Sequence, residues 1–343
     1  MRFILYYGLF LAKIVTSVVI TIIMLIVIKK IIHRKKSLHT GYLALTNLGD
    51  HYRDIKKEML FVSMSSNEDN QWQKENENKS KKIFSLFNRW KKQKLHKKIK
   101  PIIYVIDFNG SFDAKEVSSL REEISAVLLV AKKTDQVLLR LESSGGLVHS
   151  YGLAASQLQR LRNKGIFLNV IVDKIAASGG YMMATVANHI IAAPFAIIGS
   201  IGVVAQFPNF HRLLKRNEID FELHTAGEHK RTLTLFGENS EQARQKFRDE
   251  LDVTHQLFKS FVHDMRPTLD IDRVATGEHW FGTQALKKGL IDAIGTSDDF
   301  ILHKMNKYDL IALHYRYRGK GWINNLLQSK IYKIIEKLIW QFI

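Results

Sequence analysis

The chain has 343 residues and no cysteine, which excludes disulfides, a thiol nucleophile and thiolate metal sites. Its formal net charge is +18, but five Lys/Arg in 29–36 and ten in 79–100 supply +15 of it, with no acidic residue in either range. The rest of the chain is therefore nearly balanced. No nucleic-acid reader motif accompanies the basic ranges, so we expect no nucleic-acid partner.

The N-terminal segment is apolar. Residues 3–28 contain one charge, Lys13, and as a helix they would span about 39 Å, more than the roughly 30 Å hydrocarbon core of a bilayer. A cleaved signal peptide is the alternative, but the run is long and no small-x-small site follows it. We therefore interpret residues 1–36 as an uncleaved anchor with a basic flank. Because the basic residues follow the run, the positive-inside rule places the rest of the chain in the cytoplasm.

Residues 37–100 are interpreted as a polar, basic linker region. Within it, 62–100 is low in complexity and lacks the apolar content to fold alone, so we expect it to be mostly disordered. Ile83, Phe84, Phe87 and Trp90 fall near helical spacing among lysines, which is compatible with a helix on anionic lipid. A solvated basic linker is the alternative, and it is favoured.

Residues 101–321 have the pattern of a folded domain, in which β-branched apolar runs alternate with helical patterns. Strands are predicted at 102–108, 137–143, 167–173, 189–193 and 220–225, and helices near 115–131, 151–163, 178–187, 208–216 and 240–263. This alternation predicts a mainly parallel sheet covered by helices. The apolar stretch 181–205 is not interpreted as a second membrane span, because Asn188, His189 and Pro194 interrupt it.

The C-terminal residues 322–343 carry apolar side chains along one helical face, which predicts an amphipathic helix. Such a helix would pack on the domain, on another subunit or on a membrane surface. The sequence does not decide between these three.

The segment DKIAASGGYMMA, residues 173–184, contains the candidate nucleophile Ser178. A serine hydroxyl needs a base to take its proton and hydrogen-bond donors for the oxyanion that follows. Small neighbours allow a sharp strand-to-helix turn, at which the N–H of Gly179 faces outward and favours negative charge. A second donor is expected from ESSGGLV, residues 142–148, where Gly145 and Gly146 permit close approach of a substrate. Either glycine pair alone is also typical of an ordinary strand-end turn.

The base is less evident from the residues alone. None of the histidines considered stands in a recognisable motif: His149, His189, His224 and His229. Lysine accepts a proton only as the neutral amine, which burial or nearby positive charge favours. Lys230 follows a predicted strand in HTAGEHKRTLTLFGE, but on the sequence alone such a lysine is more often an ordinary surface residue.

Several long motifs, taken together and in order, resemble the S49 family of serine peptidases, the signal peptide peptidase A group. They are VLLRLESSGGLVHSYGLAASQLQRLR, VDKIAASGGYMMA, APFAIIGSIGVVAQ, LHTAGEHKRTLTLFGEN and ATGEHWFGTQALKKGLID. The resemblance covers nearly the whole chain. It implies an α/β, ClpP/crotonase-like fold of repeated ββα units and a serine endopeptidase of the cell inner membrane, acting on short or unfolded hydrophobic peptides such as signal-peptide remnants.

The resemblance also implies a role for each site residue. Ser178 would be the nucleophile, Lys230 the general base, and Ser200, in GSIG, the residue that orients the lysine. The oxyanion hole would be formed by three glycines: Gly179, Gly145 and Gly146. No cofactor and no metal is implied.

Related enzymes form rings in which serine and lysine meet across a subunit boundary, so a homo-oligomeric ring with shared active sites is expected. The chain departs from the family pattern at Ser144, where proline is usual, and at His229, where tyrosine is common. Losing the proline costs about 0.5–1 kcal/mol through the unfolded state. If the tyrosine ring helps to bury the lysine, an imidazole in its place would slow the enzyme.

Two other functions remain open at this stage. One is a crotonase-type acyl-CoA enzyme on the same scaffold, and the other is a catalytically weak membrane scaffold. The side of the membrane is also open, because the basic flank favours the cytoplasm whereas the related signal peptide peptidases work outside it.

Overall fold

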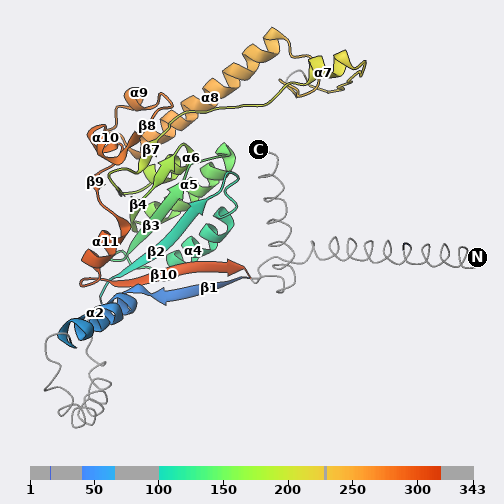
Figure 1. The fold of residues 1–343 in the computed structure, drawn as a ribbon. Coiled ribbons are helices and arrows are strands. Elements are labelled where there is room, and N and C mark those ends of the chain that lie inside the picture. Colours follow the sequence, from blue (N-terminus) through green and yellow to red (C-terminus); the bar gives the residue numbers. More distant parts are fainter. Residues whose placement is uncertain (1–15, 17–40, 66–99, 228–229, 318–343) are drawn as a thin grey trace, which may run out of the picture. The chain divides into compact units, whose positions relative to one another are not determined.

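The computed structural model describes residues 16, 41–65, 100–227 and 230–317. Within these residues ten strands form one sheet (Figure 1). The strands are β1 Gly41–Asn47, β2 Ile102–Gly110, β3 Gln136–Ser143, β4 Phe167–Val172, β5 Ile175–Ala177, β6 His189–Ala192, β7 Ile197–Gly199, β8 His279–Phe281, β9 Ala293–Ile294 and β10 Asp309–Tyr317. The helices are α2 Leu48–Ser65, α4 Val117–Val130, α5 Val148–Asn163, α6 Gly179–Thr185, α7 His211–Arg216, α8 Glu241–Met265, α9 Ile271–Val274, α10 Gly282–Lys287 and α11 Ser297–Lys304.

The main path of the sheet runs β1-β10-β2-β3-β4-β6-β9. From β10 to β9 each neighbouring pair is parallel, with Val137 of β3 opposite both Tyr104 of β2 and Leu168 of β4. Helix α4 connects β2 to β3 and α5 connects β3 to β4, as parallel neighbours require a crossover. The prediction of a mainly parallel sheet covered by helices is therefore confirmed.

Both faces of the sheet are apolar, because alternate residues of each central strand point to opposite sides. In β2, Tyr104 and Ile106 contribute to the larger core, which also contains buried side chains of α4, α5 and α6. Ile103 and Val105 contribute to a smaller core, together with Ile301 of α11. Burial on both faces explains why these strands read as nearly continuous apolar runs in the sequence.

Three short strands, β5, β7 and β8, extend the sheet beside the C-terminal end of β3. Ala176 of β5 pairs with Ser143, β5 pairs in parallel with β7, and β7 pairs antiparallel with β8. These strands were not predicted, since three residues carry too little pattern to be recognised. They position the candidate site, because Ser178 directly follows β5 and Ser200 directly follows β7.

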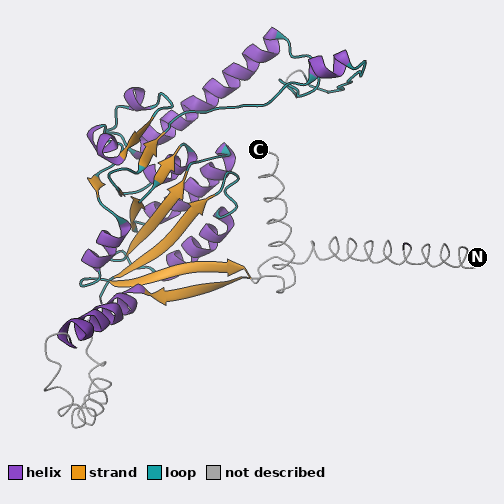
Figure 2. Cartoon of the chain, viewed as in Figure 1, coloured by secondary structure: helices purple, strands orange, loops and turns teal. Residues whose placement is uncertain are grey.

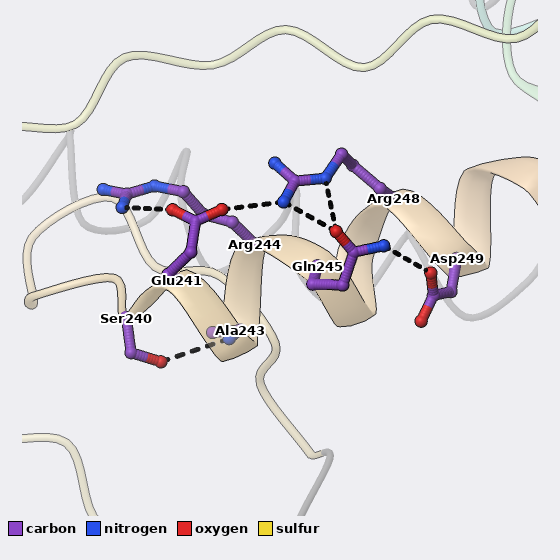
Figure 3. A network of polar contacts seen from close by, with 7 residues as sticks. All are labelled: Ser240, Glu241, Ala243, Arg244, Gln245, Arg248 and Asp249. Carbon is purple, nitrogen blue, oxygen red and sulfur yellow. Dashed lines mark hydrogen bonds and ion pairs between the residues drawn. The ribbon is translucent and has the colours of Figure 1, made fainter.

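The described residues from Val204 to the middle of α8 are mostly exposed. Helix α7 has no buried side chain, and in α8 only Phe258 and Val262, in its second half, are buried. Figure 2 shows mostly loop between β7 and α8 in the described part of this segment. The start of α8 is stabilised locally: Ser240 accepts the N–H of Ala243 at 3.1 Å, and Glu241 forms ion pairs with two arginines, Arg244 and Arg248 (Figure 3).

The C-terminal end of α8 is tied to the sheet by a charged group. Arg266 donates two hydrogen bonds to the carboxylate of Asp292, at 2.9 and 2.8 Å, and a third to the carbonyl of Gly289. Asp292 in turn accepts the N–H of Ile190 in β6 at 2.7 Å. The ion pair lowers the pKa of Asp292 despite its partial burial. The pair therefore connects α8, β6 and the segment before β9.

A second carboxyl group, that of Glu123, is buried, and no Lys or Arg in the described part of the chain forms an ion pair with it. Glu123 of α4 accepts the N–H of Tyr315 in β10 at 2.7 Å. Burial raises the pKa of Glu123 to about 7, although this hydrogen bond opposes the rise, and nearby Asp107 adds to it. Glu123 is thus a titrating group inside the fold.

The predicted helices and four of the five predicted strands are found within a few residues of their expected ends. The strand predicted at 220–225 is wrong: residues 221–225 are exposed and lie in no strand. No strand of the described residues pairs with them, so their alternating pattern alone does not make them a strand. The segment 181–205 contains parts of α6, β6 and β7, which confirms that it is not a membrane span.

Several predictions fall on residues that the structure does not describe. The anchor at 3–28, apart from Thr16, the segment 66–99 and the helix at 322–343 lie outside the described residues. Among the described residues, no helix has the length and apolar character needed to cross a bilayer. Strand β1 and helix α2 occupy 41–65, within the region expected to be a linker. The boundaries 1–36, 37–100, 101–321 and 322–343 stay predictions.

Candidate active site

Ser178 lies in the turn between β5 and α6. Its backbone has φ 51° and ψ −119°, a conformation that L-residues rarely adopt and that costs about 1–2 kcal/mol. The turn is held by the Ser178 N–H, which donates to the carbonyl of Gly199 at 2.8 Å, and by the Ser178 carbonyl, which accepts from Met182 at 2.9 Å. Strained backbone of this kind, fixed by its surroundings, is typical of functional sites.

Ser200 lies beside Ser178 because β5 and β7 are paired. Ala177 is opposite Gly199 in the parallel register, so each serine is the first residue after one of two neighbouring strands. Ser200 also has a positive φ, 53°, and its N–H donates to the carbonyl of Glu278 at 2.7 Å. The structure thus brings together the predicted nucleophile and the predicted orienting serine.

The two glycine segments meet next to Ser178. A Cβ added at Gly145 would lie 2.7 Å from the nitrogen of Gly179 and 2.8 Å from the Cβ of Ser178. Gly145 also has φ +87°, which favours glycine. The bare backbone at Gly145 therefore lies directly against the backbone of Gly179, and a side chain there would collide with the Gly179 nitrogen.

The next glycine is held against a neighbouring loop. A Cβ at Gly146 would lie 1.9 Å from the carbonyl oxygen of Phe112, and Leu147 donates its N–H to that same oxygen at 3.0 Å. Gly146 is therefore fixed in place by backbone contact.

These residues line one pocket of about 550 Å³. The lining includes Ser178, Ser200, Gly145 and Gly146, and its side chains are otherwise mainly apolar: Phe112, Leu147, Val148, Val203 and Val204. The pocket combines the candidate nucleophile, glycine backbone that is a candidate for the oxyanion donors, and apolar walls. This combination suits attack on a carbonyl group in an extended apolar peptide.

Lys230 is not part of this pocket. It is exposed, its N–H donates to the carbonyl of Gly227 at 3.2 Å, and it does not line the pocket that contains Ser178. The histidines His149, His189 and His224 do not line it either, and His229 lies outside the described residues. Within the described part of one copy, the serine therefore has no basic side chain lining its pocket.

Two residues beneath the site were not predicted, Ser143 and Tyr151. Both are buried, and their hydroxyl groups lie 2.6 Å apart. Ser143 accepts the N–H of Gly145 at 3.1 Å, and Tyr151 donates to the carbonyl of Ser111 at 2.7 Å. Both belong to the motif LESSGGLVHSYG, but nothing in their spacing distinguishes a buried hydroxyl pair from ordinary polar residues.

Comparison with known proteins decides the family. Peptidase family S49 N-terminal matches residues 2–158, and Peptidase family S49 matches residues 160–310. The chain belongs to peptidase family S49. The S49 match includes Ser178, Ser200 and Lys230, and the S49 N-terminal match includes the glycine pair.

Relatives named as proteases are similar to this chain over most of their length. The chain is 57% identical to the Probable protease SohB of Buchnera aphidicola subsp. Acyrthosiphon pisum, over 93% of this chain and 92% of the relative. It is 50% identical to the Putative protease SohB of Buchnera aphidicola subsp. Baizongia pistaciae, over 100% and 99%. The identity to the Probable protease SohB of Haemophilus influenzae is 49%, over 91% and 89%. The prediction of a serine-type peptidase of family S49 is therefore confirmed.

Proposed function

We propose that this S49 peptidase is a membrane-anchored endopeptidase in which Ser178 of one copy and Lys230 of a neighbouring copy form the catalytic dyad. The observation that carries the proposal is the division of the site in a single chain. Ser178, Ser200 and the glycine pair Gly145–Gly146 share one pocket, whereas Lys230 is exposed on the segment between β7 and α8. This segment exposes apolar side chains, among them Val204, Leu213 and Ile219, as a surface that packs on another copy would.

In the proposed reaction, the neutral amine of Lys230 takes the proton from the Ser178 hydroxyl as its oxygen attacks the scissile carbonyl carbon. Negative charge then develops on the carbonyl oxygen, and the N–H groups of Gly179 and Gly146 stabilise it. The lysine returns its proton to the leaving amine as the peptide bond breaks, which leaves an acyl group on Ser178. A water molecule, deprotonated by the same lysine, releases the acyl group.

Ser200 has the position that an orienting residue needs. Register pairing of β5 with β7 places it next to Ser178, so its hydroxyl can accept a hydrogen bond from an incoming ammonium or donate one to a neutral amine. Burial between two copies would remove the amine of Lys230 from water and favour its neutral form. An isolated copy would then be inactive.

The proposed substrates are short or unfolded hydrophobic peptides, with signal-peptide remnants as one source. The apolar side chains of Phe112, Val148 and Val203 line the pocket beside the nucleophile, which suits an apolar residue of the substrate. An extended peptide is favoured because its backbone can pair with strand edges while alternate side chains enter pockets. The finer fold class, ClpP/crotonase-like with repeated ββα units, and the N-terminal membrane helix in the inner membrane belong to the same proposal.

The shared dyad can be tested by mixing two inactive variants of the full chain. Ser178→Ala and Lys230→Ala should each abolish cleavage of a fluorogenic apolar peptide. Co-expressed in equal amounts, they should recover about one quarter of the wild-type activity, because about one interface in four pairs an intact serine with an intact lysine.

Activity of either single variant at the wild-type level would contradict the dyad. Activity absent from the mixture, with the wild type active and the two variants shown to co-assemble, would place both residues in one copy or remove Lys230 from the mechanism. Labelling of the wild type, but not of Ser178→Ala, by a serine-reactive phosphonate distinguishes a peptidase from an inactive scaffold. Binding of coenzyme A without labelling would favour an acyl-CoA enzyme instead.

A further inference from the structure

We propose that Tyr151 is a positioning residue. It acts through Ser143, and by contact of its ring, to hold in place the N–H groups that stabilise the oxyanion formed when Ser178 attacks. The proposal rests on the function proposed above, since it concerns the same site. Tyr151 touches neither the pocket nor the reacting atoms. Its effect is carried by a chain of hydrogen bonds to Gly145 and by contact of its ring with Gly179.

The direction of each hydrogen bond in the chain is fixed by its ends. The carbonyl of Ser111 can only accept, so the Tyr151 hydroxyl donates to it at 2.7 Å. With its proton used there, the Tyr151 oxygen accepts from the Ser143 hydroxyl at 2.6 Å. The Ser143 oxygen is then free to accept the N–H of Gly145 at 3.1 Å. All three hydrogen bonds therefore donate in the same direction, from the N–H of Gly145 to the carbonyl of Ser111, and each bond polarises the next.

The protonation state of Tyr151 supports this direction. Burial raises the pKa of Tyr151, although the hydrogen bond with Ser143 lowers it. The hydroxyl therefore keeps its proton at neutral pH and remains available to the Ser111 carbonyl.

These hydrogen bonds determine which glycine of the Gly145–Gly146 pair can donate its N–H to an oxyanion. The N–H of Gly145 is engaged with Ser143, so it is not available to a substrate. The N–H of Gly146 has no hydrogen-bond partner among the described residues, and Gly146 lines the pocket. Holding Gly145 toward the interior thus leaves Gly146 as the donor from this loop.

The ring of Tyr151 also supports the other donor. A Cβ at Gly179 would lie 2.4 Å from the Cγ of Tyr151, so the ring packs directly against the backbone that follows the nucleophile. The far end of the same side chain is held at Gly110, where an added Cβ would lie 2.6 Å from the Tyr151 hydroxyl. One side chain therefore contacts the backbone of one donor and controls, through Ser143, the loop of the other.

A buried tyrosine with satisfied hydrogen bonds is also an ordinary core residue, so the test must separate positioning from packing. Tyr151→Phe keeps the ring and removes only the hydroxyl, which leaves the Ser143 hydroxyl without its acceptor. Tyr181→Phe is a matched control, because Tyr181 is also fully buried and its hydroxyl donates to the carbonyl of Leu290 at 2.8 Å, away from Ser143. Ser143→Ala removes the acceptor of the Gly145 N–H directly.

The experiment compares the full-length wild type with these three variants, using a fluorogenic apolar peptide and the matching peptide boronate. The boronate forms a tetrahedral adduct with the serine and so reports on the oxyanion donors. Loss of a whole oxyanion donor lowers kcat by about 10²–10³-fold. For a donor that is displaced rather than lost, we expect kcat to fall about 10-fold or more in Tyr151→Phe and in Ser143→Ala, with KM within about twofold.

Affinity for the boronate should fall in parallel with kcat in these two variants and stay at the wild-type level in Tyr181→Phe. The double variant Tyr151→Phe/Ser143→Ala should be no worse than either single variant, since both interrupt one chain. Equal kcat in Tyr151→Phe and Tyr181→Phe, or a change confined to KM, would overturn the proposal. If Tyr151→Phe does not fold, Ser143→Ala decides in the same way.

The test is independent of the dyad. A wild type that neither cleaves the peptide nor binds the boronate would contradict the proposed function. A wild type that does both, with kcat unchanged in Ser143→Ala, would contradict only the role of the hydrogen-bond chain.

Discussion

Replacing Glu123 with glutamine is expected to stabilise the protein at pH 8 and to leave its stability unchanged near pH 4.5. Glu123 is buried in α4 and accepts the N–H of Tyr315. Glutamine has nearly the same shape and can accept the same hydrogen bond through its Oε1, but it carries no charge at any pH. The variant therefore removes the cost of burying a carboxylate and retains the contact.

The size of the effect follows from the pKa of Glu123, which rises from 4.5 to about 7 on folding. The folded state thus binds more protons than the unfolded state between these two pH values. The stability that the protonated group contributes is fully present below pH 4.5 and is lost as the pH rises through about 7. One pKa unit corresponds to about 1.4 kcal/mol, which gives an upper limit of about 3.5 kcal/mol for the gain at pH 8.

The measurement is the free energy of unfolding of the full chain in detergent, from urea titrations between pH 5 and 8. Other carboxyl groups titrate in the same range, so the quantity to compare is the difference between variant and wild type at each pH. Glu122→Gln is the control, because Glu122 is exposed on the same helix and should change stability by less than about 0.5 kcal/mol. A difference for Glu123→Gln that stays constant from pH 5 to 8 would refute the reasoning.

Two further predictions concern the strained serine and the end of α8. Ser178→Gly should be about 1 kcal/mol more stable than Ser178→Ala, the reverse of the usual order, because φ is 51° at this position. Equal or opposite stabilities of the two variants in thermal unfolding would show that the turn carries no strain. Both variants should lack peptidase activity. Arg266→Ala should lower the free energy of unfolding by about 3 kcal/mol, since it leaves Asp292 partly buried without its cation. Arg273→Ala, which removes an exposed ion pair, is the control for the second variant, and a loss as small as the control's would contradict it.

The sequence predicted the central sheet well because its strands are long and are buried on both faces. A short apolar run such as IIYVIDF, followed by a helical pattern of suitable length, predicts a buried strand of a parallel sheet. The strand predicted at 220–225 failed for a complementary reason. Alternation in FELHT indicates a strand only where a neighbouring strand accepts its hydrogen bonds, and these residues are exposed loop.

The site was predicted in part. The turn at Ser178 and the glycine pair at Gly145–Gly146 were recognised as strand-end turns, and the structure brings both to one pocket. Their meeting depends on β5 and β7, whose three residues each show no period that sequence analysis can detect. The hydroxyl pair Ser143–Tyr151 escaped for another reason: eight residues separate a strand end from a helix position, and only the fold makes them neighbours.

The role of Lys230 is evident neither from the residues around it nor from the structure of one chain. Its assignment came from the family resemblance, and the residues around it, HTAGEHKRT, carry no feature that distinguishes a base from a surface lysine. A single chain leaves it exposed. In the proposed shared dyad, the environment of Lys230 comes from a neighbouring copy, so neither a local sequence pattern nor the surroundings of Lys230 in one chain would reveal its role.

The pairing of Ala177 with Gly199 limits how the length of the chain can change around the site. Deleting one residue from β7 would turn the side chain of Ser200 to the opposite face of its strand, because side chains alternate with a period of two. Residues after Val203 are under no such restriction, since no strand pairing involves the described residues from there to β8. Insertions and deletions between Ile175 and Ser200 should therefore be rejected, whereas those in the loops between Val203 and α8 leave this strand register intact and act only through the position of Lys230.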